Sequence, residues 1–375
     1  MELSLQQIDN RSIFSLNLKD LKACLKDSDF KAFNADQIFS WLYQKHEYNL
    51  ENWTNISNDL KQFIMDRFSV ELPKIIWDGL SKDGTRKFLI VMADGKSVEA
   101  VMIPAKNNRK TICVSSQVGC AIGCTFCHTG TMGLTRHLDA GEIVGQYLTV
   151  TKFLQTNVDA NERLTNIVYM GQGEPLHNFD NVKTATEIFL EPKGLGLGQR
   201  RVTLSTSGLV PQIKRLEEFP PVNIAISLHA AHNDIRTELM PINKAYDLDR
   251  LLDSIKEIPL KAHRYITYEY LLIDKYNDRA EDIEALGKLL PRKVSKINLI
   301  PFNEYPQSDF KRPSVSRVRW FQDQLEKLGY TCTIRTTKGN DILAACGQLK
   351  SEIDSGGLNL WNEKQESSST TTSQT

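Results

Sequence analysis

The sequence predicts an α/β protein whose largest part is a partial, open (β/α)6 barrel. After residue 111, short β-rich runs, most of them continuously apolar, alternate with segments of helical periodicity. Repeated β–α units form parallel strands with right-handed crossovers, and functional residues gather at the carboxyl ends of the strands. Six units are too few to close an eight-stranded barrel. The six runs are TICVSS, NIVYMG, VTLSTS, NIAISLH, YITYEYLLI and KINLIP.

Helical segments separate these runs, and the barrel is expected to span residues 106–349. Asp139 with Glu142 three residues later is typical of a capping box at the start of the first barrel helix. A final helix and strand follow the sixth run. Their sequences are RVRWFQDQLEKLG and TCTIRT.

Three regions flank the barrel. Residues 1–75 carry apolar residues at three- and four-residue intervals and predict a small helical accessory domain, whose second helix is expected to be capped by Asn34 or Asp36. Residues 76–105 place a D-G turn between two apolar runs, which predicts a β-hairpin linker. Residues 350–375 are polar and low in complexity, and we expect most of them to be disordered.

Composition indicates an ordinary globular protein of a reducing compartment. The 375 residues have a formal net charge of zero and a hydrophobic content of 41%, so any basic surface for nucleic acid must be local. No signal peptide or membrane-spanning stretch is evident. Seven cysteines, an odd number, favour thiols that serve metals or chemistry over structural disulfides. The cytoplasm is the expected location.

Three closely spaced cysteines follow the first barrel strand. Cys120, Cys124 and Cys127 have the spacing C-x3-C-x2-C, while Cys113 lies upstream within the strand. One interpretation is structural zinc with His128 or a distant cysteine as the fourth ligand. A second is a ferredoxin-like cluster with Cys113 as the fourth thiolate. A third is a [4Fe–4S] cluster with one open iron, where a substrate or cofactor could bind.

The spacing C-x3-C-x2-C, with an aromatic residue at Phe126, resembles the radical S-adenosylmethionine (SAM) superfamily. Between about residue 95 and residue 349 the chain is also similar to the RlmN family of adenine-C2 methyltransferases. This resemblance implies a radical SAM fold, a [4Fe–4S] cluster on Cys120, Cys124 and Cys127, and SAM on its open iron. It also implies methylation of adenosine 2503 in 23S rRNA and adenosine 37 in tRNA. The motifs that carry it are CVSSQVGC, MGQGEPLHN, RRVTLSTSG, ISLHA, MPIN, KINLIPFN and ACGQL.

The SAM pocket is expected at the strand ends. Gly171 and Gly173 allow the backbone to approach a ligand, and the Glu174 carboxylate suits an ammonium group. Neither GQGEP nor GLGLG has the complete dinucleotide-binding pattern. Gln172 departs from the family, which usually has Met there. The SAM-binding residues that the resemblance implies are Gly173, Glu174, Ser205, Ser227, Leu228, His229 and Asn303.

The resemblance also implies roles for three further residues. Cys346 is the S-methylcysteine intermediate, Cys113 resolves it through a transient disulfide, and Glu99 accepts the proton from adenine C2. Taken singly, both cysteines would be small buried core residues and Glu99 a solvated carboxylate. Cys24 and Cys332 are interpreted as core residues.

The expected partners are 23S rRNA and tRNA, an electron donor such as flavodoxin, and a reductant for the disulfide. Lys106, Arg109 and Lys110 are the candidate phosphate contacts, because an enzyme that acts on a base must hold the RNA backbone. A monomer without membrane contact is expected. Two alternatives stay open: a Cfr-type enzyme that methylates C8 of adenosine, and a non-enzymatic RNA-binding module stabilised by zinc or an iron–sulfur cluster.

Overall fold

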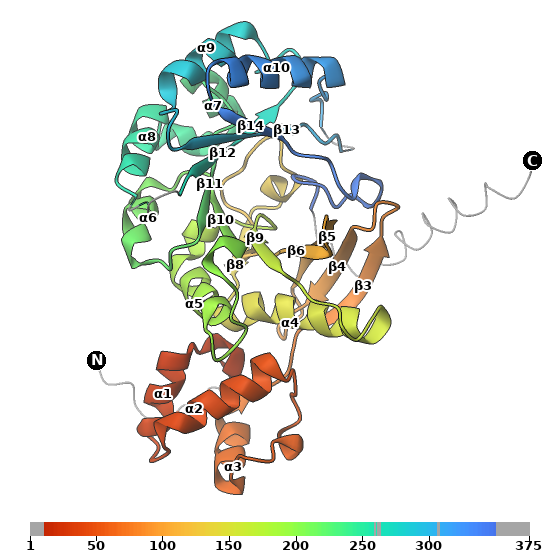
Figure 1. Ribbon diagram of the computed structural model, residues 1–375, viewed down its shortest axis with the longest axis vertical. Coiled ribbons are helices and arrows are strands. Elements are labelled where there is room, and N and C mark those ends of the chain that lie inside the picture. Colours follow the sequence, from red (N-terminus) through yellow and green to blue (C-terminus); the bar gives the residue numbers. More distant parts are fainter. Residues whose placement is uncertain (1–10, 259, 261–263, 306–307, 350–375) are drawn as a thin grey trace, which may run out of the picture.

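A ten-stranded mixed sheet organises the protein (Figure 1). The structure is a computed structural model, and it describes residues 11–258, 260, 264–305 and 308–349. Seven strands pair in parallel and curl into an open barrel, as the alternating pattern predicted. In spatial order they are β6 (Arg109–Cys113), β9 (Asn166–Tyr169), β10 (Val202–Thr206), β11 (Asn223–Ser227), β12 (Ile266–Leu272), β13 (Ser295–Pro301) and β14 (Thr331–Ile334).

Helices cover the convex outer side of the barrel (Figure 1). Asp139 caps the first of them, and the reciprocal bonds of the predicted Asp139–Glu142 capping box are both present. Because the helices bury the outer face of the strands, that face is apolar, with Ile167, Leu204 and Ile224 in the main core. The helices are α4 (Ala140–Asn157), α5 (Phe179–Leu190), α6 (Val210–Ile213), α7 (Asn233–Leu239), α8 (Leu248–Lys256), α9 (Ala280–Leu289) and α10 (Val315–Lys327).

The inner face of the parallel strands carries smaller and more polar side chains than the outer face. Val168 pairs with Thr203, and Ala225 pairs with Thr267, so small and polar side chains follow one another across the inside of the barrel. These residues line a cavity instead of filling it. Parallel strands are usually apolar on both faces, so this composition leaves space for ligands.

The predicted hairpin is present and extends the same sheet. Strands β4 (Arg86–Val91) and β5 (Ser97–Ala105) form it, β3 (Lys74–Leu80) adds a further antiparallel strand, and β5 pairs antiparallel with β6. The hairpin is therefore continuous with the barrel sheet. The domain divisions proposed from the sequence stay a prediction.

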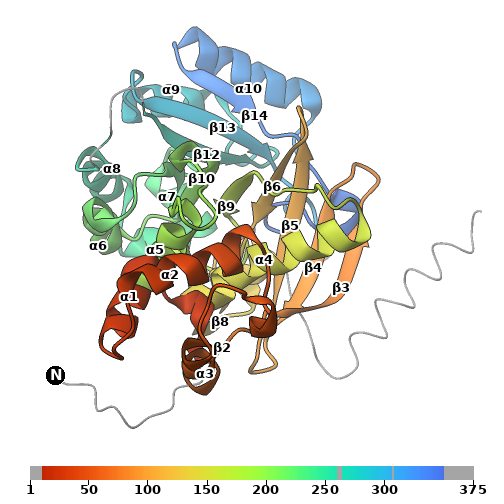
Figure 2. The same ribbon diagram turned by 60° about the horizontal axis from the view of Figure 1, so that its bottom comes forward.

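The N-terminal segment is helical, as predicted, and packs against the ends of two barrel helices (Figure 2). Ser15 Oγ donates to the Asp139 carboxylate at 3.1 Å, and Asn17 Nδ2 donates to Glu187 at 2.7 Å. Its apolar residues belong to the main core. The elements are β1 (Arg11–Ser12), α1 (Leu18–Lys26), α2 (Ala32–Phe39), α3 (Asn58–Arg67) and β2 (Phe68–Ser69).

One detail of this segment was predicted wrongly. The residue that precedes α2 is Lys31, and neither Asn34 nor Asp36 caps the helix. Asp36 instead forms ion pairs with Lys22 and Lys193. Because α2 begins at Ala32, Asn34 and Asp36 both lie inside the helix and cannot cap its start.

Three further points concern the C-terminal tail, two of the cysteines and the length of the helices. The polar tail 350–375 lies outside the described residues. Cys332 is buried in the main core and Cys24 packs against it, as expected. None of the helices in the described part of the chain combines the length and apolar character needed to cross a membrane.

Candidate active site

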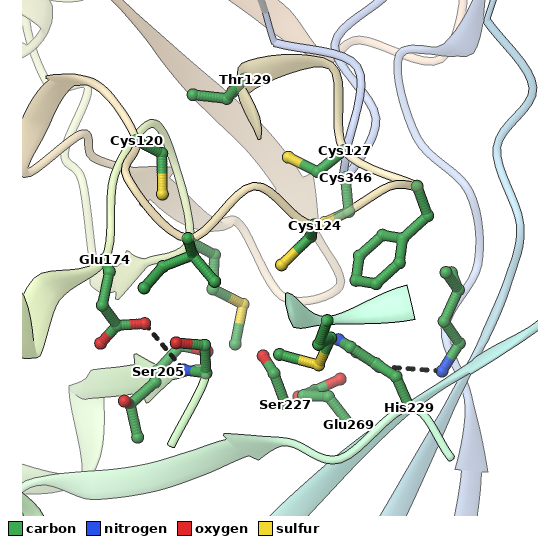
Figure 3. Close-up of a pocket in the computed structure, with 18 of the residues that line it drawn as sticks. Cys120, Cys124, Cys127, Thr129, Glu174, Ser205, Ser227, His229, Glu269 and Cys346 are labelled. Atoms are coloured by element: carbon green, nitrogen blue, oxygen red, sulfur yellow. Dashed lines mark hydrogen bonds between the residues drawn. The ribbon is translucent and has the colours of Figure 1, made fainter. Parts of the chain in front are cut away.

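The three-cysteine loop lies on one side of a cavity at the carboxyl ends of the parallel strands (Figure 3). A short antiparallel pair, β7 (Gln117–Gly119) and β8 (Leu134–His137), leads into it. Gly119 has φ 76°, and an added Cβ would lie 1.9 Å from the Gly133 carbonyl oxygen, so only glycine fits there. Cys120 N donates to the same oxygen at 2.8 Å. These contacts direct the thiols of Cys120, Cys124 and Cys127 into one cavity.

The three thiols line one cavity, and their burial disfavours the charged form of each. Burial raises the pKa of Cys120 to about 12 and raises the pKa of Cys127 above its usual range. Burial, and then repulsion by the neighbouring thiolates, raises the pKa of Cys124 well above its usual range. Three thiolates therefore need a bound cation to ionise together. This donor set fits a [4Fe–4S] cluster, whose thiolates bind separate irons.

His128 does not join the three thiols as a ligand. Its ring stacks on Tyr305 at 5.0 Å, and its backbone N–H donates to the carbonyl oxygen of Gly347 at 2.7 Å. The histidine links the cysteine loop to the C-terminal part of the chain. A zinc site of three cysteines and His128 has no support in this geometry.

Glu174 lies across the cavity from the cysteines (Figure 3). Gly173 before it has φ 97°, and an added Cβ would lie 2.5 Å from Gln117 Cβ. Burial raises the pKa of Glu174, although backbone N–H groups of Ser207 and Leu176 donate to its oxygens at 2.7 and 3.0 Å. A carboxylate held in this way presents a fixed negative charge to a cationic ligand.

The predicted SAM residues are brought together in large part. Five of the seven line the cavity with the cysteines, namely Gly173, Glu174, Ser205, Ser227 and His229. Leu228 is fully buried in the main core. Asn303 lines a neighbouring cavity with Cys346, and its Nδ2 donates to the Cys346 carbonyl oxygen at 3.2 Å.

The protonation state of His229 follows from its surroundings. Burial lowers the pKa of His229 to about 3, so the ring is neutral at pH 7. Its Nδ1 accepts from the backbone N–H of Leu271 at 3.1 Å. The proton of the neutral ring is therefore on Nε2, which makes Nε2 a donor. Phe126 packs edge-to-face on the ring at 4.9 Å and fixes its orientation.

Sequence reasoning missed two buried charged residues at this site. Arg236 donates to the carbonyl oxygens of Ser207, Ser227 and Leu228 at 2.8, 3.2 and 3.1 Å, so it fixes the ends of β10 and β11. It also donates to the Tyr246 carbonyl oxygen at 3.5 Å and to the side chain of Asn243, which lies in the MPIN motif and could have signalled it. Glu269 lines the cavity below Ser227 and accepts from Asn298 Nδ2 at 2.7 Å; no motif marked it.

Cys346 lies in the same cavity as the three-cysteine loop. Cys113 is buried beneath it, in an apolar cluster with Val101, Ala344 and Leu349. Both thiols are free. Burial, and then repulsion by the Cys346 thiolate, raises the pKa of Cys113 to about 12, whereas the Arg335 guanidinium opposes this shift. The two cysteines are therefore close enough to interact, although 233 positions separate them in the sequence.

Glu99 lies beside this pair and outside the cavity with the three thiols. It is on β5, two residues before Val101, which pairs with Cys113. Lys87 Nζ lies 3.1 Å from the Glu99 carboxylate. The backbone N–H of Glu99 donates to Gln172 Oε1 at 3.2 Å. Gln172, at the position where Met is expected from the family resemblance, thus contacts Glu99, the predicted proton acceptor.

Two sequence profiles match the chain. That of the radical SAM superfamily matches residues 114–290, and that of the ribosomal RNA large subunit methyltransferase N-terminal domain matches residues 12–70. A dual-specificity RNA methyltransferase RlmN of Nitratiruptor sp. is 44% identical over 89% of this chain and 97% of its own length. The RlmN of Marinobacter nauticus is 44% identical over 89% and 91%. The chain belongs to the RlmN family.

A solved structure agrees with this assignment. A radical SAM methyltransferase from Sphaerobacter thermophilus superposes with a TM-score of 0.84 at 38% identity, covering 91% of this chain and all of the other. As an RlmN-family member, the chain is a radical SAM enzyme with a [4Fe–4S] cluster and SAM as cofactors. The prediction of family, fold and cofactors is confirmed, and the non-enzymatic binding module is set aside.

Proposed function

We propose that the chain methylates C2 of adenosine 2503 in 23S rRNA and of adenosine 37 in tRNA, by way of a methylated Cys346. The observation that carries this proposal is the position of Cys346 in the cluster cavity with Cys113 beneath it. The names of the RlmN relatives support RNA as the substrate class.

Cys120, Cys124 and Cys127 would hold the cluster, and Glu174 would hold the ammonium of SAM. When bound, the cluster and SAM would supply the one-electron chemistry, which removes a hydrogen atom from a methyl group and later accepts one electron from the RNA adduct. His229 Nε2–H would donate to the nucleoside part of SAM, and Ser205 and Ser227 offer hydroxyls there.

The reaction then has two stages. In the first, Cys346 Sγ accepts a methyl group from one SAM. In the second, a hydrogen atom leaves this methyl group, and the resulting methylene carbon bonds to adenine C2. Glu99 accepts the C2 proton, and a thioether now joins Cys346 to the RNA.

Release needs the second cysteine. Cys113 Sγ, as a thiolate, attacks Cys346 Sγ; an S–S bond forms and the S–CH2 bond breaks. The electron pair of that bond goes to the methylene carbon, which takes up a proton and becomes the methyl group of the product. A two-electron reductant returns the disulfide to two thiols. A flavodoxin-type donor for the cluster, a monomeric state and a cytoplasmic location complete the proposal.

The three basic residues predicted from sequence to contact RNA phosphates differ in their surroundings. Lys110 is ion-paired with Glu162, whereas Lys106 lies on an exposed turn and Arg109 is an exposed residue at the start of β6. We therefore favour the latter two as phosphate contacts. The C8 alternative remains a possible outcome of the test, and the sequence Glu174-Pro175-Leu176 favours C2 over it.

The test is an anaerobic reaction of the reconstituted enzyme with SAM, a reductant and 23S rRNA or tRNA fragments, followed by mass spectrometry. We expect 2-methyladenosine from the wild type and none from Cys346→Ala. Cys113→Ala should accumulate a covalent protein–RNA adduct. Formation of 8-methyladenosine would assign the C8 reaction, and an intact cluster without methylated RNA would refute the proposal.

A further inference from the structure

A lysine and a glutamate form an ion pair inside the antiparallel part of the sheet. Lys87 on β4 and Glu99 on β5 are only 2% and 4% exposed. Lys87 Nζ lies 3.1 Å from Glu99 Oε1. Burying two charges costs several kcal/mol per ion, and a buried pair is by itself weak evidence for stability. A role in the chemistry explains its presence better.

The same ammonium group contacts the segment that carries Cys346, residues 336–349, which we call the Cys346 segment. Lys87 Nζ donates to the Leu343 carbonyl oxygen at 3.3 Å. Leu343 has φ 49°, a conformation that costs a non-glycine residue about 1–3 kcal/mol and persists only where its surroundings hold it. Lys87 is one of the groups that hold it.

The pairing of the strands places these groups on one face of the sheet. Lys87 pairs with Val101, and Val101 pairs with Cys113. Directly paired residues share a face, as do residues two apart on one strand. Lys87, Glu99 and Cys113 therefore lie on the same face, and the Cys346 segment packs against it.

We propose that Lys87 is a positioning residue for methyl transfer to RNA. Its ammonium keeps the Glu99 carboxylate charged and in place to accept the C2 proton, because a neighbouring cation favours the ionised form. Through Leu343 it also fixes the backbone three residues before Cys346. The inference rests on the proposed function and concerns only its second stage.

Four variants test this role, with each stage measured separately. Lys87→Met keeps the length of the side chain and removes the charge, and Lys87→Arg keeps the charge. Glu99→Gln removes the proton acceptor. Lys96→Met, an exposed lysine in the same hairpin, is the matched control.

We expect Lys87→Met to methylate Cys346 at the wild-type rate but to release methylated RNA about 100-fold more slowly, the lower end of the effect of a general base. The covalent protein–RNA adduct should accumulate, as in Glu99→Gln. Lys87→Arg should release methylated RNA at least tenfold faster than Lys87→Met, and Lys96→Met should release it at the wild-type rate.

Wild-type release from Lys87→Met, or an equal loss of Cys346 methylation and RNA release, would overturn the inference. Removal of one partner of a buried pair can also destabilise the fold. The double variant Lys87→Met/Glu99→Gln addresses this: it should regain thermal stability without regaining RNA release. If the wild type itself yields no methylated adenosine, the proposed function fails instead.

A second inference rests on the opposite end of the barrel. A cavity of about 660 Å3 opens at the amino ends of the parallel strands. It shares Met170, Glu269 and Arg335 with the cavity that holds the cysteines, so the two are contiguous. Its rim carries Arg200, Arg264, Tyr265 and Lys296, which we call the lower mouth.

The lower mouth combines cations with an aromatic ring. Tyr265 is 42% exposed, and Lys296 Nζ lies 4.3 Å from the centre of its ring. Arg264 donates to Asn223 Oδ1 at 2.7 Å, and Asn223 Nδ2 donates to the Arg200 carbonyl oxygen at 3.0 Å, which ties the rim together. Basic residues around an exposed aromatic ring are typical of surfaces that bind single-stranded nucleic acid.

We infer that the lower mouth binds the RNA strand beside the target adenosine, with phosphates on the cations and a neighbouring base on Tyr265. The chain has no net charge, so a local basic surface is needed for RNA to bind. This inference also rests on the proposed function.

The test uses Arg200→Ala, Tyr265→Ala and Lys296→Ala, with Lys288→Ala on the outer helix α9 as control. We expect KM for an RNA hairpin to rise about tenfold for Tyr265→Ala, the effect of one stacked base. The two cation variants should weaken the salt dependence of binding by about one charge each. Cys346 methylation should be unchanged. Wild-type KM and salt dependence in all three would refute the inference, provided that the wild type makes product.

Discussion

The two sides of the active-site cavity are built differently. On the SAM side, Gly173 and Glu174 follow β9, Ser205 and Ser227 lie at the carboxyl ends of β10 and β11, and backbone hydrogen bonds hold the Glu174 carboxylate. On the RNA side, Glu99, Cys113 and Cys346 come from distant parts of the chain and meet on the antiparallel part of the sheet. The first arrangement is a property of the barrel. The second requires the hairpin and the Cys346 segment, and variants can separate the two.

The largest effect is expected at Arg236, which supports the SAM side. Arg236→Met removes the donors to five acceptors, four of them backbone carbonyl oxygens, and leaves these buried acceptors with fewer partners inside the protein. We expect a loss of about 3–5 kcal/mol in the free energy of unfolding. Urea unfolding measures it. Arg250→Met, at an exposed arginine on the next helix, should change stability by less than about 0.5 kcal/mol.

Glu174→Gln should affect both stages of the reaction. The charge proposed to receive the SAM ammonium is lost while the shape is kept, and a charge-assisted hydrogen bond contributes about 1.5–3 kcal/mol, or roughly 10–100-fold in affinity. SAM binding by calorimetry, Cys346 methylation and RNA methylation should all decline. Glu217→Gln, at an exposed position of the 3-10 helix Lys214–Glu218, is the control. Loss of RNA methylation alone would contradict the division into two sides.

Gln172→Met should affect the second stage alone. Gln172 Oε1 accepts from the backbone N–H of Glu99 at 3.2 Å, and a thioether is a weak acceptor. Loss of one neutral hydrogen bond costs about 1 kcal/mol. The rate of RNA release should therefore fall by about fivefold, while the rate of Cys346 methylation is unchanged. Rates of the two stages in the same preparation provide the comparison. An equal slowing of both would place Gln172 with the SAM pocket.

The same division explains how far the sequence could predict the site. The strands and the cysteine loop could be predicted because each belongs to an apolar run or a local motif, and five of the seven residues expected to bind SAM line one cavity for the same reason. Lys87 has no such signal: its run, RKFLIV, is that of an ordinary hairpin strand. Its burial depends on the Cys346 segment, more than 240 positions later. Glu269 was missed for a related reason, since only the hollow inside of the barrel distinguishes it from other strand residues.

The smallest effect is expected where the Cys346 segment meets the hairpin. Asp83 in the β3–β4 turn accepts from the backbone N–H of Thr85 at 2.9 Å and from that of Gly339 at 3.0 Å. Burial acts to raise the pKa of Asp83, but these hydrogen bonds and nearby Lys338 outweigh it and lower the pKa to about 2. Asp83→Asn keeps one acceptor oxygen and should cost about 1 kcal/mol or less, because the group is partly exposed.

The pH dependence of this cost has a definite sign. The folded-state pKa of Asp83 lies below its ordinary value of 3.8, so the charged form stabilises the fold above about pH 4, and the contribution is lost as the pH falls toward 2. The difference in thermal stability between wild type and Asp83→Asn should therefore be constant from pH 7 to pH 5 and narrow below pH 4. A difference that widens in acid would exclude the carboxylate as an anchor. Because neither Asp83 nor Gly339 lines the cavity of the three cysteines and Glu174, SAM binding should be the same in both proteins.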